Sequence, residues 1–287
     1  MGNVSASGDY GALWVRPTTM GDGRSEGTRA RMKVLMKQVA RRRSRLPQLV
    51  LLAGLLGGCA QPEPSGAGAT EAAAGIPAHD PTVFETTIDS FERDDQRSPP
   101  ARGGVLFVGS SSVRLWETLE RDMAPMDVLN RGFGGSRTDD VLHYAHRIVL
   151  PYHPRAIVFY AGDNDLGRDK DATPESVAEH FERLVETVEQ AGQRPDIYFV
   201  SIKPSPARMK RWSRMHAANE LVAAYAMRTE RVSYLDVSSA MLGEGGVPRA
   251  ELYRRDGLHM NARGYDAWTR VIRPAVMSEV GPNPLFM

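Results

Sequence analysis

Three residue types that can together cleave an ester lie far apart in this chain. An apolar, strand-like run at 105–108 leads into Gly-Ser-Ser-Ser at 109–112, and near the other end Asp256 stands three residues before His259. A serine hydroxyl is a weak nucleophile at neutral pH. It needs a base to accept its proton, and the base needs a carboxylate that fixes its tautomer and stabilises the imidazolium. The pattern therefore predicts a serine nucleophile activated by an aspartate-histidine pair.

Two segments between these residues could supply hydrogen-bond donors to the reaction. Residues 130–135 read Asn-Arg-Gly-Phe-Gly-Gly, and residues 162–165 read Gly-Asp-Asn-Asp. Attack on an acyl carbonyl places negative charge on its oxygen, and fixed hydrogen-bond donors stabilise that charge. A glycine at 135 would also let the backbone approach the substrate closely.

Each of these features also has an ordinary structural explanation. Three consecutive serines are typical of a turn and a helix N-cap, and many Asp-x-x-His pairs are solvated surface residues. Asn164 could brace its loop through an Asx-turn. The glycines at 132–135 could form a tight turn or a phosphate loop, but no Gly-Lys-Ser/Thr follows them, which argues against phosphate.

A metal site is the rival interpretation for the histidines. His143 and His146 have the spacing of one helix face, and Asp139 and Asp140 lie one turn earlier. Such histidines on a surface helix are more often solvated, and no cysteine pair or His-Glu-x-x-His pattern accompanies them. We therefore predict no metal and no other cofactor.

The elements that must position these residues alternate along the chain. Short apolar runs predict strands near 104–109, 128–129, 156–160, 197–202 and 232–237, and amphipathic spacing predicts helices near 115–123, 139–148, 174–191, 209–229 and 262–280. Strands separated by helices form a parallel sheet that is covered on both faces. The chain is thus predicted to be an α/β protein, a three-layer α/β/α sandwich.

The order of the elements brings the chemical residues to one edge. Ser111, Gly135 and Asn164 follow the first, second and third predicted strands. In an open parallel sheet ligands bind beyond the carboxyl ends of the strands. We therefore expect these residues to form one site, which arginines 114, 131 and 137 flank either as substrate contacts or in salt bridges.

Charge divides the chain into two unlike parts. The net charge of +1 averages a basic segment, 1–58, which has 10 Lys and Arg against 3 Asp and Glu, with a remainder that has 26 against 32. The remainder is mildly acidic, and a nucleic-acid-binding protein needs a basic footprint. Nucleic acid is therefore excluded as a partner.

The basic segment has the features of an export signal. Lys and Arg between 33 and 45 precede a short apolar run at 49–56, which is too short to span a bilayer, and the only cysteine, Cys59, follows in Leu-Gly-Gly-Cys. This resembles the lipobox of bacterial lipoproteins, in which the cysteine is acylated. We expect an N-terminal extension and signal at 1–58, a flexible tether at 59–81 and a catalytic domain at 82–287.

The serine segment, Gly135, Asn164 and the Asp256/His259 pair together resemble the SGNH hydrolases, also called the GDSL family. They follow that family's order over 103–277, and residues 201–206 and 257–261 are similar to its secreted bacterial esterase branch. The resemblance implies a five-stranded, flavodoxin-like parallel sheet and a Ser111-His259-Asp256 triad. It also implies an oxyanion hole formed by the N–H groups of Ser111 and Gly135 and by the Asn164 amide.

The chain departs from the family in one position of the nucleophile motif. Ser110 stands where the family usually has aspartate, so Ser110 and Ser112 remain alternatives to Ser111. The expected activity is hydrolysis of carboxylic esters, such as short acyl esters, acetylated sugars or lysophospholipids, by a lipid-anchored protein of the bacterial cell envelope. An envelope carbohydrate O-acyltransferase and a catalytically silent glycan-binding lipoprotein are the alternatives. We expect residues 203–212 and 243–248 to determine specificity.

Overall fold

A five-stranded parallel sheet forms the centre of the computed structural model, which describes residues 79–281. Its strands are β1 (Val105–Gly109), β2 (Val128–Gly132), β3 (Ala156–Tyr160), β4 (Asp196–Val200) and β5 (Val232–Leu235). The strand order is β2-β1-β3-β4-β5, and every neighbouring pair is parallel. This is the order of flavodoxin-like sheets, so the predicted fold class is confirmed.

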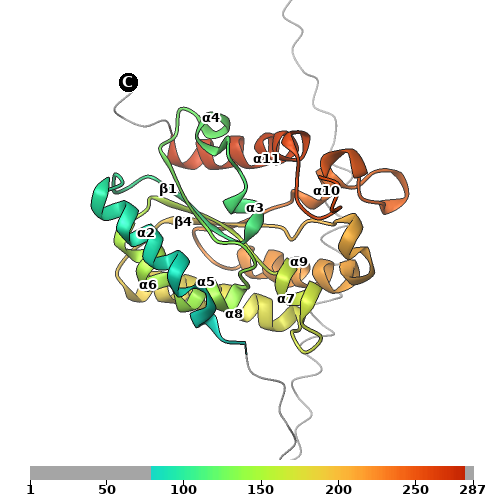
Figure 1. The fold of residues 1–287 in the computed structure, drawn as a ribbon, viewed down its shortest axis with the longest axis horizontal. Coiled ribbons are helices and arrows are strands. Elements are labelled where there is room, and N and C mark those ends of the chain that lie inside the picture. Colours follow the sequence, from blue (N-terminus) through green and yellow to red (C-terminus); the bar gives the residue numbers. More distant parts are fainter. Residues whose placement is uncertain (1–78, 282–287) are drawn as a thin grey trace, which may run out of the picture. The chain divides into compact units, whose positions relative to one another are not determined.

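Helices cover both faces of this sheet (Figure 1). One layer contains α2 (Glu85–Arg97), α5 (Thr138–His143), α6 (Ala145–Ile148), α8 (Pro174–Gln190) and α9 (Trp212–Ala226), and the other contains α4 (Leu119–Met123) and α11 (Ala262–Val280). Three shorter helices, α3 (Ser111–Arg114), α7 (Asp163–Arg168) and α10 (Ser238–Met241), lie near the sheet's carboxyl edge or after its last strand. The three-layer sandwich is thus present.

The side chains of β1 show why this sheet needs two helical layers. Leu106 and Val108 belong to one apolar cluster, and Val105 and Phe107 belong to the other, because successive side chains of a strand point to opposite faces. All four are essentially inaccessible to solvent. Burial of a side chain of this size contributes roughly 1.5–3 kcal/mol, so both faces stabilise the fold.

The two long helices begin where local sequence signals place their first turns. Thr173 caps α8 by accepting the N–H of Ser176 at 3.1 Å, and Pro174 occupies the first helical position, where its missing N–H costs nothing. The side chain of Asn261 caps α11 by accepting the N–H of Gly264 at 3.2 Å. Both predicted starts agree with the structure.

Two predicted helices are broken in the structure. The helix expected at 139–148 is interrupted at Tyr144, which separates α5 from α6. The helix expected at 209–229 begins as a 3-10 segment, Pro206–Arg211, and becomes α9 only at Trp212. Non-helical dihedral angles at Arg208 (φ −119°, ψ 17°) accompany the second break, and its side chain points inward.

The packed part of the chain begins earlier than the expected boundary at 82. His79 contacts Asp140, and Asp80 caps a 3-10 helix, Pro81–Phe84, although all three positions 79–81 were assigned to the tether. The following helix α2 was not predicted, and it contributes one fully buried apolar residue, Ile88.

Ion pairs supply much of the contact that α2 makes with the rest of the domain. Arg147 of α6 donates to Asp89 at 2.7 Å, to Glu92 at 2.6 Å and also to Glu85. The three carboxylates are each more than two-fifths exposed, so solvent screens these pairs and each contributes little by itself.

The part of the chain that the structure describes contains no helix that is long and apolar enough to cross a bilayer. The predicted export signal and Cys59 lie outside the described residues.

Candidate active site

A serine, a histidine and an aspartate converge at the carboxyl edge of the sheet. Ser111 Oγ lies 3.1 Å from His259 Nε2, and His259 Nδ1 lies 2.7 Å from Asp256 Oδ2. These are hydrogen-bond distances, although 148 positions separate the serine from the histidine. The structure therefore brings together all three residues that were expected to form the triad.

The local structure around each partner fixes this geometry. Ser111 is the first residue of α3, directly after β1, and the Tyr265 hydroxyl of α11 donates to the neighbouring Ser112 carbonyl at 3.1 Å. The histidine loop is held by a bond from the Arg254 N–H to the His259 carbonyl (2.8 Å) and by the buried side chain of Met260. Both segments are thus anchored on the face that α11 covers.

Only one of the three consecutive serines is placed to react. Ser110 and Ser112 are 0% and 1% exposed, and neither hydroxyl has a hydrogen bond to His259 within residues 79–281. Ser111 is partly exposed and is the serine that reaches His259. The geometry therefore favours Ser111 over both alternatives.

The carboxylate of Asp256 is tied to both the ring and the backbone of its loop. Its Oδ1 accepts the N–H groups of Leu258 and His259, each at 2.9 Å, while Oδ2 contacts the ring. Partial burial opposes ionisation, but these hydrogen bonds outweigh it and lower the pKa of Asp256 to about 2. The group is therefore an anion throughout the neutral range and can orient the imidazole.

Donors for an oxyanion lie on the three loops that follow β1, β2 and β3. Within the described part of the chain, the backbone N–H groups of Ser111 and Gly135 have no hydrogen-bond acceptor. Gly135 has φ +90°, a conformation that a residue with a Cβ rarely adopts. The Asn164 side chain is 4% exposed and uses one amide hydrogen to bind the Ser136 carbonyl at 2.9 Å, which leaves its second amide hydrogen for a ligand.

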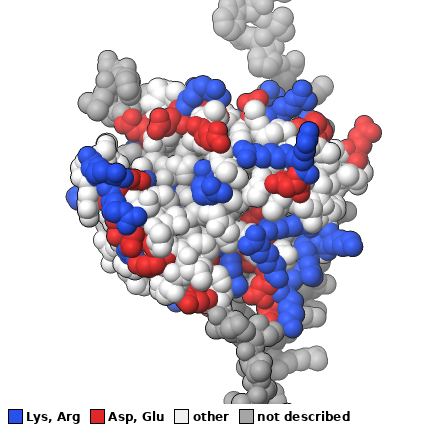
Figure 2. All heavy atoms as spheres, in the orientation of Figure 1, with Lys and Arg blue, Asp and Glu red and all other residues white. Residues whose placement is uncertain are grey.

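A cavity of about 480 Å³ adjoins two of these donors, Gly135 and Asn164. Its lining consists of His79, Gly135, Arg137, Asn164, Arg168, Asp169, Lys170 and Asp171. On the face drawn in Figure 2, Lys and Arg side chains gather on the side where Figure 1 places α7 and α9, with Asp and Glu among them. The cavity is thus lined by hydrogen-bonding and charged groups of both signs, without a large apolar side chain.

The three arginines expected to flank the site have different roles. Arg131 donates to Tyr152 (2.7 Å) and to Asp95, so it is structural and lies away from the reactive groups. Arg137 lines the cavity and pairs with Asp169 at 3.0 Å. Arg114 is exposed and packs beside Gly134 in the loop that carries the second donor.

The histidines that were considered as metal ligands do not approach one another through their rings. His143 and His146 are exposed, and His146 Nδ1 lies 3.1 Å from the His143 carbonyl oxygen. Two other sets of potential ligand atoms lie within 4.8 Å of one another: His79 with Asp139 and Asp140, and Asp139 with Asp165 and His180.

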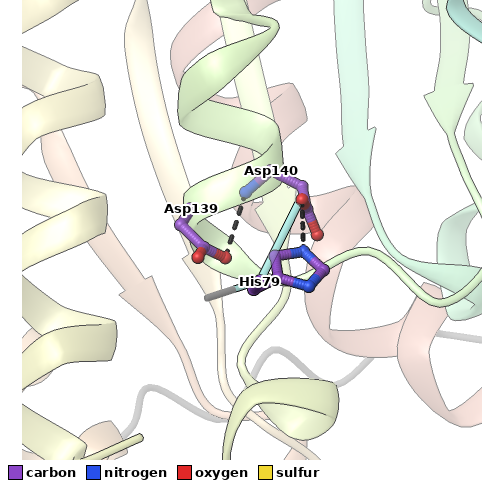
Figure 3. Close-up of side chains that lie close together, drawn as sticks. All are labelled: His79, Asp139 and Asp140. Atoms are coloured by element: carbon purple, nitrogen blue, oxygen red, sulfur yellow. Dashed lines mark hydrogen bonds and ion pairs between the residues drawn. The ribbon is translucent and has the colours of Figure 1, made fainter. Parts of the chain in front are cut away.

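Hydrogen bonds account for the closeness of the first of these sets (Figure 3). His79 Nε2 lies 2.6 Å from Asp140 Oδ1, and the other oxygen of Asp140 accepts the Arg137 N–H at 2.8 Å. Asp139 in turn accepts the Asp140 N–H at 3.2 Å. These groups satisfy one another, and the absence of a metal ion from the protein's chemistry stays a prediction.

A buried polar network beneath Asn164 was not foreseen from the sequence. Lys203 and Arg208, which were expected to belong to a specificity loop, instead point inward and contact Asp163 at 3.3 and 3.2 Å. Lys203 is 1% exposed. A lysine and an arginine that follow a buried strand closely are the only signal in the sequence that could have indicated this network.

Comparison with known proteins supports the assignment of the fold and of the enzyme class, the hydrolases of ester bonds. Residues 103–267 match the GDSL-like Lipase/Acylhydrolase family, a span that includes every residue of the candidate site. Among curated proteins, none matches the chain in sequence.

Solved structures of three bacterial proteins are similar in fold. A GDSL-like lipase from Bacteroides thetaiotaomicron has a TM-score of 0.54 at 19% identity, with 70% of this chain and 98% of that chain covered. A lipase/acylhydrolase from Enterococcus faecalis has 0.51 at 20% identity, with 63% and 98% covered. An acetylxylan esterase from Geobacillus stearothermophilus has 0.50 at 16% identity, with 64% and 96% covered.

Proposed function

The chain belongs to the GDSL-like lipase/acylhydrolase family, which makes it a hydrolase of ester bonds, and we propose that it removes short acyl groups from a polar alcohol such as a glycan. Ser111 is the nucleophile, His259 the base and Asp256 the residue that orients the base. The observation that carries this proposal is the 3.1 Å contact between Ser111 Oγ and His259 Nε2, beside N–H donors that have no acceptor among residues 79–281.

The proposed reaction has two halves. His259 Nε2 accepts the Ser111 hydroxyl proton as Oγ attacks the acyl carbonyl, and the N–H groups of Ser111 and Gly135 and the Asn164 amide stabilise the oxyanion. His259 then gives that proton to the departing alkoxide, which leaves an acyl-serine. A water molecule then gives a proton to His259 and attacks the acyl carbon. The bond between the acyl carbon and Ser111 Oγ breaks, His259 returns the proton to Oγ, and the acid leaves. His259 and Asp256 are both partly exposed, and this access to water favours hydrolysis over transfer to another alcohol.

The lining of the cavity supports a short acyl group on a polar alcohol. A long acyl chain gains about 0.8 kcal/mol for each CH₂ that it buries against apolar groups. Here it would meet Arg137, Arg168 and Lys170, whose desolvation opposes that gain. The hydroxyl groups of a sugar can instead hydrogen-bond to such side chains.

A series of p-nitrophenyl esters tests this assignment of the substrate class. We expect kcat/KM to be highest for acetate and to fall at least about tenfold by octanoate, because charged side chains and no large apolar side chain line the cavity. Acetylated xylo-oligosaccharides and acetylated glycerol serve as matched sugar and non-sugar alcohols. Rates that rise with acyl length would contradict the proposal.

The pH dependence of the reaction should show a single ionisation on its acidic side. The pKa of Asp256, about 2, lies below the usual value of 3.8, so this carboxylate is protonated only as the pH falls through about 2. Histidine, the residue type proposed as the base, ordinarily titrates near pH 6.5. We expect log(kcat/KM) to decline with a slope of one below about pH 6.5, and a flat profile down to pH 5 would refute an imidazole base.

We also propose that the protein is a lipoprotein of the bacterial cell envelope, anchored through Cys59. The support is the order of basic segment, short apolar run and cysteine at 33–59. When the full chain is expressed in bacteria fed an alkyne fatty acid, we expect the wild type to be labelled and Cys59→Ser to be unlabelled. Equal labelling of the two proteins would exclude Cys59 as the attachment site.

A further inference from the structure

We propose that Arg208 is a positioning residue of the oxyanion hole, which holds the Asn164 amide in its donating orientation and strengthens its N–H as a donor. This inference rests on the function proposed above. It concerns a residue that does not line the cavity and has no place in the triad. Arg208 acts through Asn164, on the side of the amide that faces away from the substrate.

The contacts of Arg208 place it directly behind the amide. Arg208 Nη2 donates to Asn164 Oδ1 at 2.9 Å, while the amide nitrogen of Asn164 donates to the Ser136 carbonyl at 2.9 Å. Both ends of the amide are therefore fixed, and a flipped amide would direct its NH₂ group at a guanidinium. Only one orientation is compatible with these partners, and it leaves the second N–H of Asn164 free.

The guanidinium is itself held rigidly. Its Nη1 donates to the backbone carbonyl of Asp163 and pairs with the Asp163 carboxylate at 3.2 Å. Arg208 is 9% exposed and Asp163 is 4% exposed. A buried charge-assisted pair with this geometry fixes an arginine far better than a surface pair does.

The buried network contains one acidic side chain, Asp163, and two basic side chains, Lys203 and Arg208. Lys203 Nζ lies 3.3 Å from the same Asp163 carboxylate and 3.2 Å from the Tyr160 hydroxyl. Burial opposes ionisation of Asp163, but the charges of Lys203 and Arg208 outweigh it and lower the pKa of Asp163, so the carboxylate is an anion. One anion therefore faces two basic groups, and Arg208 reaches beyond it to the amide. Positive charge behind an amide oxygen polarises the amide and makes its N–H a better donor to a developing oxyanion.

Helix α7 has a glycine, Gly167, at the point where it contacts the Arg208 side chain. A Cβ on Gly167 of α7 would lie 2.7 Å from both Cδ and Nε of Arg208. That distance is below any normal contact, so a residue larger than glycine at 167 would displace the guanidinium. Gly167→Ala therefore perturbs Arg208 without removing its charge, and alanine is the better helix former of the two.

Kinetics of Arg208 variants test the inference. With p-nitrophenyl acetate we expect Arg208→Met to lower kcat about tenfold with KM changed less than about threefold, because the donor acts in the transition state. Arg208→Lys should recover part of the lost kcat, because lysine restores the positive charge but lacks the planar guanidinium group that donates to two partners at once. Gly167→Ala should lower kcat in the same way. Arg228→Met, which removes an exposed arginine paired with Glu182, is the matched control and should leave kcat unchanged.

A double-mutant cycle with Asn164→Ala separates this role from a structural one. If Arg208 acts through the amide, Arg208→Met should cause almost no further loss of kcat in the Asn164→Ala background. An equal loss in both backgrounds, or no loss in the wild-type background, overturns the inference. If Arg208→Met does not fold, as judged by its thermal transition, the same cycle is carried out with Gly167→Ala. A wild-type rate for Asn164→Ala itself would instead refute the oxyanion hole on which the inference rests.

Discussion

Replacement of Ser111 by alanine is expected to reduce the hydrolysis of p-nitrophenyl acetate by about 10⁴-fold or more. The reason is that Ser111 Oγ is the only serine oxygen in the described residues that contacts the imidazole of His259. We therefore expect no other serine hydroxyl of residues 79–281 to form the acyl-enzyme. Initial rates measured at pH 8 test this expectation directly.

The adjacent Ser112 supplies a matched control. Its side chain is 1% exposed and faces the interior, so Ser112→Ala should retain kcat within about threefold and label normally with a fluorophosphonate probe. Ser111→Ala should not label at all while its thermal transition stays close to that of the wild type. Normal turnover by Ser111→Ala, or loss of labelling only in Ser112→Ala, would show that the nucleophile has been assigned to the wrong serine.

The sheet and the convergent residues could be predicted because their signals are local and strong. Apolar runs such as 156–160 are buried on both faces in a parallel sheet, so they stand out without knowledge of any partner. Ser111, Gly135 and Asn164 each follow such a run directly. The topology of a parallel sheet then brings them to one edge, and a resemblance to known hydrolases was enough to add Asp256 and His259.

The remaining features depend on contacts between distant positions that leave no local pattern. Helix α2 was missed because Ile88 is its one fully buried apolar residue and much of its contact is with Arg147, far along the chain. Arg208 was assigned to a substrate-facing loop because lysines and arginines are usually exposed. The Arg208 side chain can point inward because it pairs with the Asp163 carboxylate and because Gly167 has no Cβ to displace it. Neither contact is evident before the fold is known.

Replacement of Asn164 by aspartate should lower kcat at least as much as replacement by alanine, about 10²–10³-fold, with a small change in KM. Aspartate has the size and shape of asparagine but no N–H to offer the oxyanion. Its carboxylate would also face the Ser136 carbonyl, which now accepts a hydrogen bond from Asn164 Nδ2 at 2.9 Å. Steady-state kinetics with p-nitrophenyl acetate measure both constants.

The same pair of variants separates the two explanations that the sequence allowed for Asn164. An Asx-turn needs only a side-chain oxygen, which aspartate supplies and alanine lacks. If Asn164 merely braced its loop, Asn164→Asp would therefore restore most of the activity that Asn164→Ala loses. Because Oδ1 is occupied by Arg208 and the amide lies at the cavity beside Gly135, we expect the reverse, with aspartate no better than alanine. We therefore expect this position to need a hydrogen-bond donor and not an acceptor.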